Sequence, residues 1–404
     1  MPSIKTFGEL LDIGSYDRFA NAVRSIRDNL LLIGCVVLVI LAKLLVVYEA
    51  KYLVEQDIAV LTNPTYEADP LISALGSQWD ASYFVQIAMN GYPATDEPNV
   101  LFAFAPVFPY TVALANTVVG DFYLAAILVS NVFYFLSLPA FYYVAKRYME
   151  RRAALLSTTL FAVFPTYLTY GTVAYTESMA LFFAIVSWYF FEREYYALSS
   201  GLLAVAVLTR YIFLVVVPIY AILMVSRGLR RGEGAAHLRA FFNPRLLWLL
   251  IPLVSLYAVF SYFEYLTGDF FAVVASHRFF EDRLTTPVDQ FTWFFTGFFV
   301  RINQVNPVEI LLLRYIFTIP FGLLTVSLLR RNRELALYGI LLMWITFSMS
   351  GISALASPRI MLSSWVTFNA LGNDTPPLVY VLFIALAVVT GTWVMLMFLT
   401  TFFA

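Results

Sequence analysis

The chain has 404 residues, of which 61% are hydrophobic and only 13% are charged, and its formal net charge is −1. Soluble domains are roughly one quarter charged, so this composition excludes a soluble globular protein and indicates a polytopic membrane protein. The single cysteine, Cys35, excludes a disulfide framework and a cysteine-based metal site.

Residues 1–28 are polar and mixed in charge, unlike the short amino-terminal region of a cleaved signal peptide. We therefore expect the first apolar segment to remain as a membrane anchor. Eight segments approach the roughly 20 apolar residues that a spanning helix needs. They are residues 30–49, 122–145, 153–171, 177–196, 246–266, 309–329, 335–354 and 378–402.

Two other apolar regions are less regular. Residues 104–119 begin with the sequence FAPVFP, and its prolines predict that no helix starts before Pro109. Residues 197–226 form a long apolar run with Arg210 near its middle. The sequence around 360–377 is short for a span and is broken by GNDTPP, so the side of the carboxyl terminus stays open.

Charged loops predict how the chain is oriented. Lysine and arginine cluster after residue 145, before residue 246 and after residue 329, which predicts three cytoplasmic loops. By contrast, residues 51–103 hold one lysine and seven acidic residues. We therefore expect 51–103 to be the first outer loop and about 267–308 to be the second, within a single integral-membrane domain over 1–404.

The same orientation places residues 192–194 and Arg227 on the cytoplasmic side. The chain between them must cross twice or form a re-entrant hairpin, and two half-length helices meeting at Arg210 fit its length. Non-helical backbone at membrane depth is tolerated where protein or a water-filled cavity covers it. The sequence therefore predicts that Arg210 points into a cavity.

The stretch SQWDASYFVQIAMNGY, residues 77–92, lies in the first outer loop. Its apolar residues recur at helical spacing, from Trp79 and Tyr83 onwards, and Gly91 is placed to end an amphipathic helix. Asp80 falls in the first turn, where the helix dipole favours a carboxylate. A carboxylate near an apolar surface, with no partner close in sequence, is a candidate general base. The alternative is that Asp80 only caps the helix.

Glu177 and Arg210 are further candidates in the apolar segments. Glu177 lies at the outer start of a predicted span, where it or Thr176 could simply cap the helix. Arginine at membrane depth costs several kcal/mol and commonly marks a functional cavity, so Arg210 is a candidate partner for an anionic group.

Arg359 and His277 are candidates in the outer segments. Arg359 lies at the outer end of a predicted span, where an arginine can also extend to the interface. His277 would be the only outward histidine, although its charged neighbours Arg278, Glu281, Asp282 and Arg283 are also typical of a solvated loop.

Several chemistries have no sequence support. The chain lacks a D-x-D pair, a phosphate-binding G-x-x-x-x-G-K-[ST] loop and an H-E-x-x-H zinc helix. His237 falls in a basic cytoplasmic loop, which argues against an intramembrane Ser-His hydrolase. The basic residues follow membrane orientation, so no nucleic-acid partner is predicted. We expect no cofactor and no clear outer-face metal cage; dependence on a divalent metal is left open.

Four segments in order resemble the second mannosyltransferase of GPI-anchor assembly, the phosphatidylinositol-glycan class V family. QWDASYFVQIAMNGY, followed by FAFAPVFP, resembles that family's first outer loop, with its Trp-Asp pair. YTESMALFF is similar to its Ser-Glu-Ser segment, LAVAVLTRYIF to its Ala-rich helix ending in Arg, and SPRIMLSSW to its late Arg-containing segment. The resemblance covers about residues 78–365, and the short chain is most similar to prokaryotic, particularly archaeal, members.

The resemblance implies an all-α, multispanning GT-C glycosyltransferase that uses a polyprenyl-phosphate sugar. Its catalytic carboxylate would be Asp80, with donor or substrate contacts from Arg210, Arg359, Glu177, Trp79, Tyr83 and His277. The expected partners are polyprenyl-phosphate mannose, a lipid-linked glycan or glycolipid acceptor, and membrane lipids. The active site would face the extracytoplasmic side of the cell membrane in a prokaryote, or of the endoplasmic reticulum in a eukaryote.

Two other functions remain open from the sequence. A broken helix carrying Arg210 also suits a transporter or flippase for a lipid-linked glycan, although no paired halves are evident. The chain could also be a non-catalytic subunit of a glycosylation complex.

Overall fold

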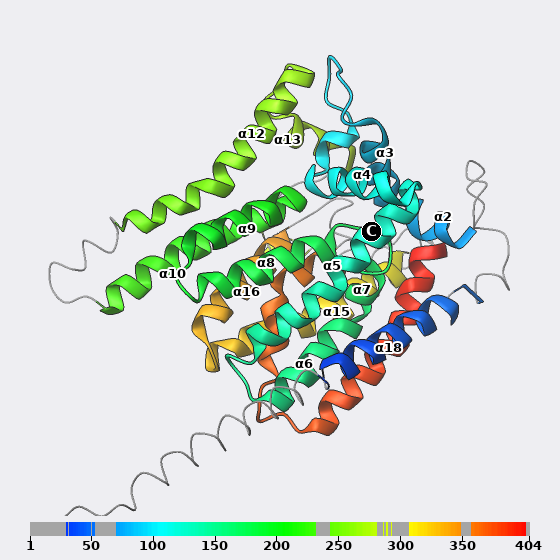
Figure 1. Ribbon diagram of the computed structural model, residues 1–404. Helices are drawn as coiled ribbons and strands as arrows, with labels where there is room; N and C mark the ends of the chain where they lie inside the picture. The colour runs from blue at the N-terminus through cyan, green and yellow to red at the C-terminus, as the bar shows by residue number, and fades with distance from the viewer. Residues whose placement is uncertain are drawn as a thin grey trace, which may run out of the picture.

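The protein is an all-α, polytopic helical bundle, which confirms the predicted fold class (Figure 1). The computed structural model describes residues 30, 32–49, 51–52, 70–231, 243–280, 286, 288–289, 292, 307–348 and 357–400, and over these ranges it contains helices and no strand. Five helices in the described ranges are long and apolar enough to cross a membrane. They are Leu32–Glu49, Phe122–Ala145, Tyr211–Arg230, Pro244–Thr267 and Pro377–Leu399.

Short helices occupy the described part of the predicted first outer loop. They are α2 (Pro70–Ser77), α3 (Asp80–Asn90) and the 3-10 turn η1 (Val100–Ala103). The amphipathic helix and its end at Gly91 are confirmed, since Gly91 has φ 72°. The next helix, α4, spans Val107–Val119, so the expectation that no helix starts before Pro109 is wrong. A proline in the first turn is tolerated because the first amide hydrogens of a helix have no intrahelical acceptor.

Two predicted spans are broken or shortened. Helix α5 (Phe122–Ala145) matches its prediction, but residues 153–171 form α6 (Arg151–Val163) and α7 (Pro165–Tyr170). The break has a local cause, because Pro165 disfavours a helical conformation at Phe164, whose ψ is 129°. Helix α8 (Glu177–Phe191) ends five residues before the predicted 196, and Glu194 has a positive φ of 61° in the turn that follows.

The chain breaks at Arg210, as predicted. Helix α9 (Tyr196–Thr209) ends there, Arg210 is extended (φ −149°, ψ 117°), and η2 (Tyr211–Val215) leads into α10 (Val216–Arg231). The two arms are unequal, however. The second arm is long enough to span a membrane, so the prediction of two half-length helices is wrong for this arm.

The carboxyl-terminal half continues the bundle. It contains η3 (Pro244–Leu249), α12 (Leu250–Thr267), α13 (Ala272–Ser276), η4 (His277–Phe280), α15 (Pro307–Ser327), η5 (Leu328–Arg330), α16 (Arg333–Ser348), α17 (Ser357–Ile360), η7 (Met361–Ala370) and α18 (Pro377–Thr400). The end of the predicted span 335–354, and Glu281, Asp282 and Arg283 of the predicted second outer loop, lie outside the described residues.

Helix α8 lies at the centre of the packing. It contacts α9, α5, α7 and η7, while α18 packs on α6 and α7 (Figure 1). The amino-terminal helix Leu32–Glu49 is tied to this core by Lys43, which is 5% exposed. Its ammonium donates to Asn131 Oδ1 at 2.7 Å and to the Gly171 carbonyl at 2.8 Å, and lies 3.7 Å from the centre of the Tyr134 ring.

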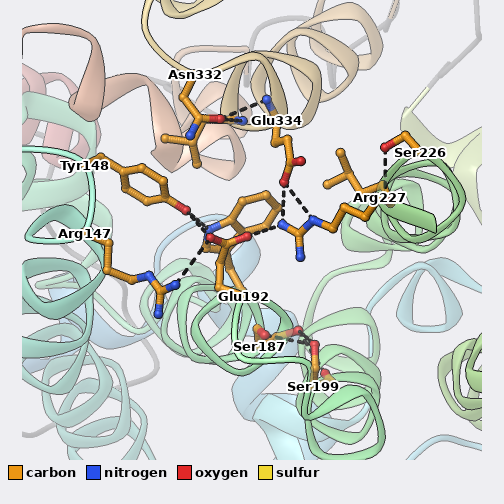
Figure 2. A network of polar contacts seen from close by, with 12 residues as sticks. Arg147, Tyr148, Ser187, Glu192, Ser199, Ser226, Arg227, Asn332 and Glu334 are labelled. Atoms are coloured by element: carbon orange, nitrogen blue, oxygen red, sulfur yellow. Dashed lines mark hydrogen bonds and ion pairs between the residues drawn. The ribbon is translucent and has the colours of Figure 1, made fainter. Parts of the chain in front are cut away.

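An ionic network forms at the carboxyl-terminal end of α8 (Figure 2). Arg227 from α10 pairs with Glu192, which follows α8, and with Glu334 from the first turn of α16. Glu192 also accepts a hydrogen bond from Tyr148 and lies 3.8 Å from Arg147. This network therefore joins the ends of three helices. Since α8 has 15 residues, the network and Glu177 lie about 22 Å apart along its axis.

Arg227→Ala is expected to lower the free energy of unfolding by about 3–5 kcal/mol, because it leaves two mostly buried carboxylates without their shared cation. Denaturation of the purified protein in detergent measures this loss. Arg230→Ala is the control, because Arg230 pairs only with Glu334 among the described residues and is 64% exposed. Its effect should stay below about 1 kcal/mol. Equal losses in the two variants would contradict the structural role of the network.

Candidate functional site

A cavity of about 570 Å³ opens beside α3, at the break between α9 and η2. Six of the seven predicted site residues line it: Trp79, Asp80, Tyr83, Arg210, His277 and Arg359. The predicted cavity at Arg210 is therefore present. Glu177, the seventh predicted residue, is not among the lining residues and lies behind the wall.

The local backbone presents Asp80 to the cavity. Asp80 is the first residue of α3, and the preceding Trp79 has the unusual angles φ 55° and ψ −129°. A non-glycine residue in such a conformation is strained and must be held by its surroundings. Two hydrogen bonds hold this backbone conformation: Trp79 Nε1 donates to the Phe398 carbonyl at 2.9 Å, and the Asp80 amide donates to the Tyr175 hydroxyl at 3.2 Å.

The Asp80 carboxylate makes a contact distant in sequence. Its Oδ2 accepts a hydrogen bond from Arg359 Nη1 at 2.8 Å, and both side chains are mostly buried. The residue at the helix cap is Trp79, which makes no capping bond through its side chain. Asp80 thus joins α3 to α17, which a simple helix cap would not do.

Arg359 and Arg210 share a second carboxylate. Arg359 Nε lies 3.2 Å from Glu177 Oε1, and Arg210 Nη1 donates to the same oxygen. Arg210 Nη1 also lies 3.2 Å from the Thr176 hydroxyl, so Thr176 contacts the arginine instead of capping α8. The result is an alternating chain of charges in the order Asp80, Arg359, Glu177, Arg210.

The surroundings fix the protonation of two members of the site. Burial alone would lower the pKa of Arg359, but the neighbouring Asp80 and Glu177 carboxylates raise that pKa above its ordinary value. Burial, reinforced by the Asp80 carboxylate, raises the pKa of Tyr175 well above its usual range. The guanidinium therefore stays charged, and the phenol keeps its proton.

Aromatic side chains form one wall of the cavity. Tyr83 stacks on Phe104 with ring centres 5.0 Å apart, and Phe104 meets Phe280 edge-on at 6.0 Å. His277 and Phe280 come from η4, so the predicted first and second outer loops meet at this wall. An apolar surface beside fixed charges suits a ligand with a lipid or sugar face and an anionic group.

Sequence reasoning missed Tyr175 and Phe104. Both lay in stretches that carried the family resemblance, but hydrophobicity alone did not separate them from other core aromatics. Over the described ranges, no group of three or more histidine, cysteine, aspartate or glutamate side chains could hold a metal ion. Asp80 and Glu177 are paired with arginines instead.

Residues 97–248 match the family model described as dolichyl-phosphate-mannose-protein mannosyltransferase. The match covers less than half of the chain; it includes Glu177 and Arg210 but not Asp80 or Arg359. No curated protein matches the sequence.

The chain is also similar to solved structures of the archaeal oligosaccharyltransferase AglB from Archaeoglobus fulgidus. The structure with an inhibitory peptide and a dolichol-phosphate has a TM-score of 0.44 and 12% identity, over 89% of this chain and 55% of that one. The structure tethered to an acceptor peptide has a TM-score of 0.46 and 12% identity, over 90% and 55%. The structure with zinc and sulfate has a TM-score of 0.44 and 14% identity, over 79% and 48%. The chain therefore spans about half the length of these structures.

Proposed function

We propose that this protein transfers mannose from a polyprenyl-phosphate donor, such as dolichyl phosphate mannose, to a lipid-linked glycan or glycolipid, with inversion at the anomeric carbon. The observation that carries the proposal is the Asp80–Arg359 ion pair in a cavity that Arg210 also lines. The matched mannosyltransferase family supports the donor class. The resemblance to the GPI-anchor mannosyltransferase supports mannose and the extracytoplasmic side.

In the proposed reaction, Asp80 accepts the proton of the acceptor hydroxyl as the hydroxyl oxygen attacks the anomeric carbon. The bond between that carbon and the phosphate oxygen breaks, and the polyprenyl phosphate leaves as an anion. Asp80 Oδ2 is engaged by Arg359, which orients the carboxylate and leaves Oδ1 to face the hydroxyl. No metal is assigned a role in this step.

Arg359 and Arg210 would stabilise the negative charge that develops on the leaving phosphate. A guanidinium has five N–H donors, and the ion pairs and hydrogen bonds described above use only some of them. Within the described residues, Arg210 makes its polar contacts through Nη1, and Arg359 through Nη1 and Nε. The remaining N–H groups can bind phosphate oxygens while the ion pairs persist. Trp79, Tyr83 and His277 would contact the sugar or the lipid from the cavity wall.

Purified protein in lipid nanodiscs, given synthetic polyprenyl-phosphate mannose, is expected to glycosylate the lipid fraction that accumulates in a strain lacking this gene. Mass analysis should show one added hexose, with the anomeric configuration of the product opposite to that of the donor. The glucose-bearing polyprenyl phosphate serves as the matched control and should transfer more slowly.

Absence of transfer from any polyprenyl-phosphate sugar would contradict the proposal. If the protein reconstituted in sealed lipid vesicles moved a lipid-linked glycan between leaflets and transferred no sugar, it would instead be a transporter.

A further inference from the structure

Glu177 lies outside the cavity and yet contacts both cavity arginines. It is 2% exposed and is absent from the cavity lining, whereas its neighbour Thr176 is part of it. A donor in the cavity would therefore meet Arg210 and Arg359 before it could reach Glu177. The buried carboxylate needs a role other than a direct substrate contact.

The two guanidiniums approach each other across a single oxygen. Arg210 comes from the break between α9 and η2, and Arg359 comes from α17, in the carboxyl-terminal part of the chain. Both pair with Glu177 Oε1. Two buried like charges repel strongly where little water screens them, so the shared carboxylate is what allows the guanidiniums to lie side by side.

Aromatic rings support the same arrangement from behind. The Arg359 guanidinium lies 5.2 Å from the centre of the Tyr175 ring and 5.4 Å from that of Tyr170. Both tyrosines are fully buried, so they limit where this side chain can move. Glu177 and the two rings together restrain the Arg359 guanidinium, and Arg359 also lines the cavity.

We infer that Glu177 is a positioning residue: it sets the spacing of Arg210 and Arg359 for the donor phosphate without touching the donor. This inference rests on the proposed function, because it assigns the two guanidiniums to that phosphate. The four charged residues Asp80, Glu177, Arg210 and Arg359 carry two negative and two positive charges. The site is therefore neutral before an anionic donor arrives.

Glu177→Gln keeps the side-chain shape and one acceptor oxygen but removes the negative charge. The net charge of the four-residue site then changes from zero to +1, so the KM for the anionic donor is expected to stay the same or fall. The kcat is expected to fall by about 10- to 100-fold, because small misplacements of groups that bind the reacting centre can cost this much. A direct ligand to the donor would behave differently, since its loss would raise the KM.

Steady-state kinetics with varied polyprenyl-phosphate mannose measure this split. Glu192→Gln is the matched control, because Glu192 follows the opposite end of the same helix and also bridges arginines. Its kcat per folded protein should equal that of the wild type. Glu177→Asp is the second variant, because it keeps the charge but shortens the side chain; it should recover part of the kcat lost in Glu177→Gln.

A raised donor KM with unchanged kcat in Glu177→Gln would overturn the positioning role, and so would unchanged values of both constants. Transfer by the wild-type protein, and its loss in Asp80→Asn, test the proposed function. The comparison of Glu177→Gln with the wild type tests the positioning role, so the two can fail separately.

Discussion

Asp80→Asn is expected to reduce sugar transfer by about 10²- to 10⁴-fold, the usual contribution of a positioned general base. The substitution keeps the size of the side chain and its hydrogen bond from Arg359, but it removes the basic oxygen. Because the ion pair becomes a weaker hydrogen bond and not a void, the protein should still fold and insert. Radiolabelled mannose transferred to lipid measures the effect.

Asp96→Asn is the matched control for this prediction. Asp96 belongs to the same predicted outer loop but is exposed and does not line the cavity. Its transfer rate should be within twofold of the wild type. Full activity in Asp80→Asn would remove the proposed base, and an equal loss in both variants would point to a disturbed loop instead of lost chemistry.

Arg359→Gln is expected to produce the second large loss, about 10²- to 10³-fold in kcat/KM, the range for removing one electrostatic stabiliser of the transition state. Arg359 contacts both Asp80 and Glu177. The substitution therefore removes a positive charge that would stabilise the leaving phosphate, and it also frees the Asp80 carboxylate from the contact that orients it. The KM for the donor should rise, in contrast to Glu177→Gln. Arg359→Lys should recover little, because an ammonium cannot bridge two carboxylates with the fixed geometry of a guanidinium.

Arg278→Gln is the control for Arg359→Gln. Arg278 lies in η4 beside the cavity residue His277, but its side chain is 56% exposed. Its Nη2 lies 3.7 Å from Oε2 of Glu97, which is also exposed. Arg278→Gln should change the donor KM by less than about threefold, because exposed ion pairs contribute roughly 0–1 kcal/mol. If Arg278→Gln matched Arg359→Gln, general electrostatic attraction would explain the donor's affinity better than a fixed site.

The sequence was sufficient to predict the main features of the fold. Segments of about 20 apolar residues predicted the long spans, and Arg210 within an apolar run predicted the break that the structure contains there. The errors occurred where one residue overrides hydrophobicity, as at Phe164 before Pro165, or where a turn such as that at Glu194 ends a helix early. Apolar length alone cannot distinguish a helix that crosses the membrane from a shorter buried one.

Most of the charged residues that meet at the cavity could be singled out from the sequence, but their pairing could not. Arg210 was evident from the cost of a charge at membrane depth, and Asp80 from its place in an amphipathic helix. No periodic pattern connects Asp80 with Arg359, which is 279 positions away in the chain. The position of Glu177 behind the cavity depends on the packing of α8 against its neighbours, which a single sequence does not encode locally.

The most direct test of the catalytic site is a cryo-EM structure of the protein with a non-hydrolysable polyprenyl-phosphate mannose analogue. The proposed mechanism requires phosphate oxygens within about 3.2 Å of guanidinium nitrogens of Arg210 and Arg359, the length of an ordinary hydrogen bond. It also predicts that the anomeric carbon faces Asp80, with room for a hydroxyl between them. A phosphate bound outside this cavity, or a sugar turned away from Asp80, would contradict it.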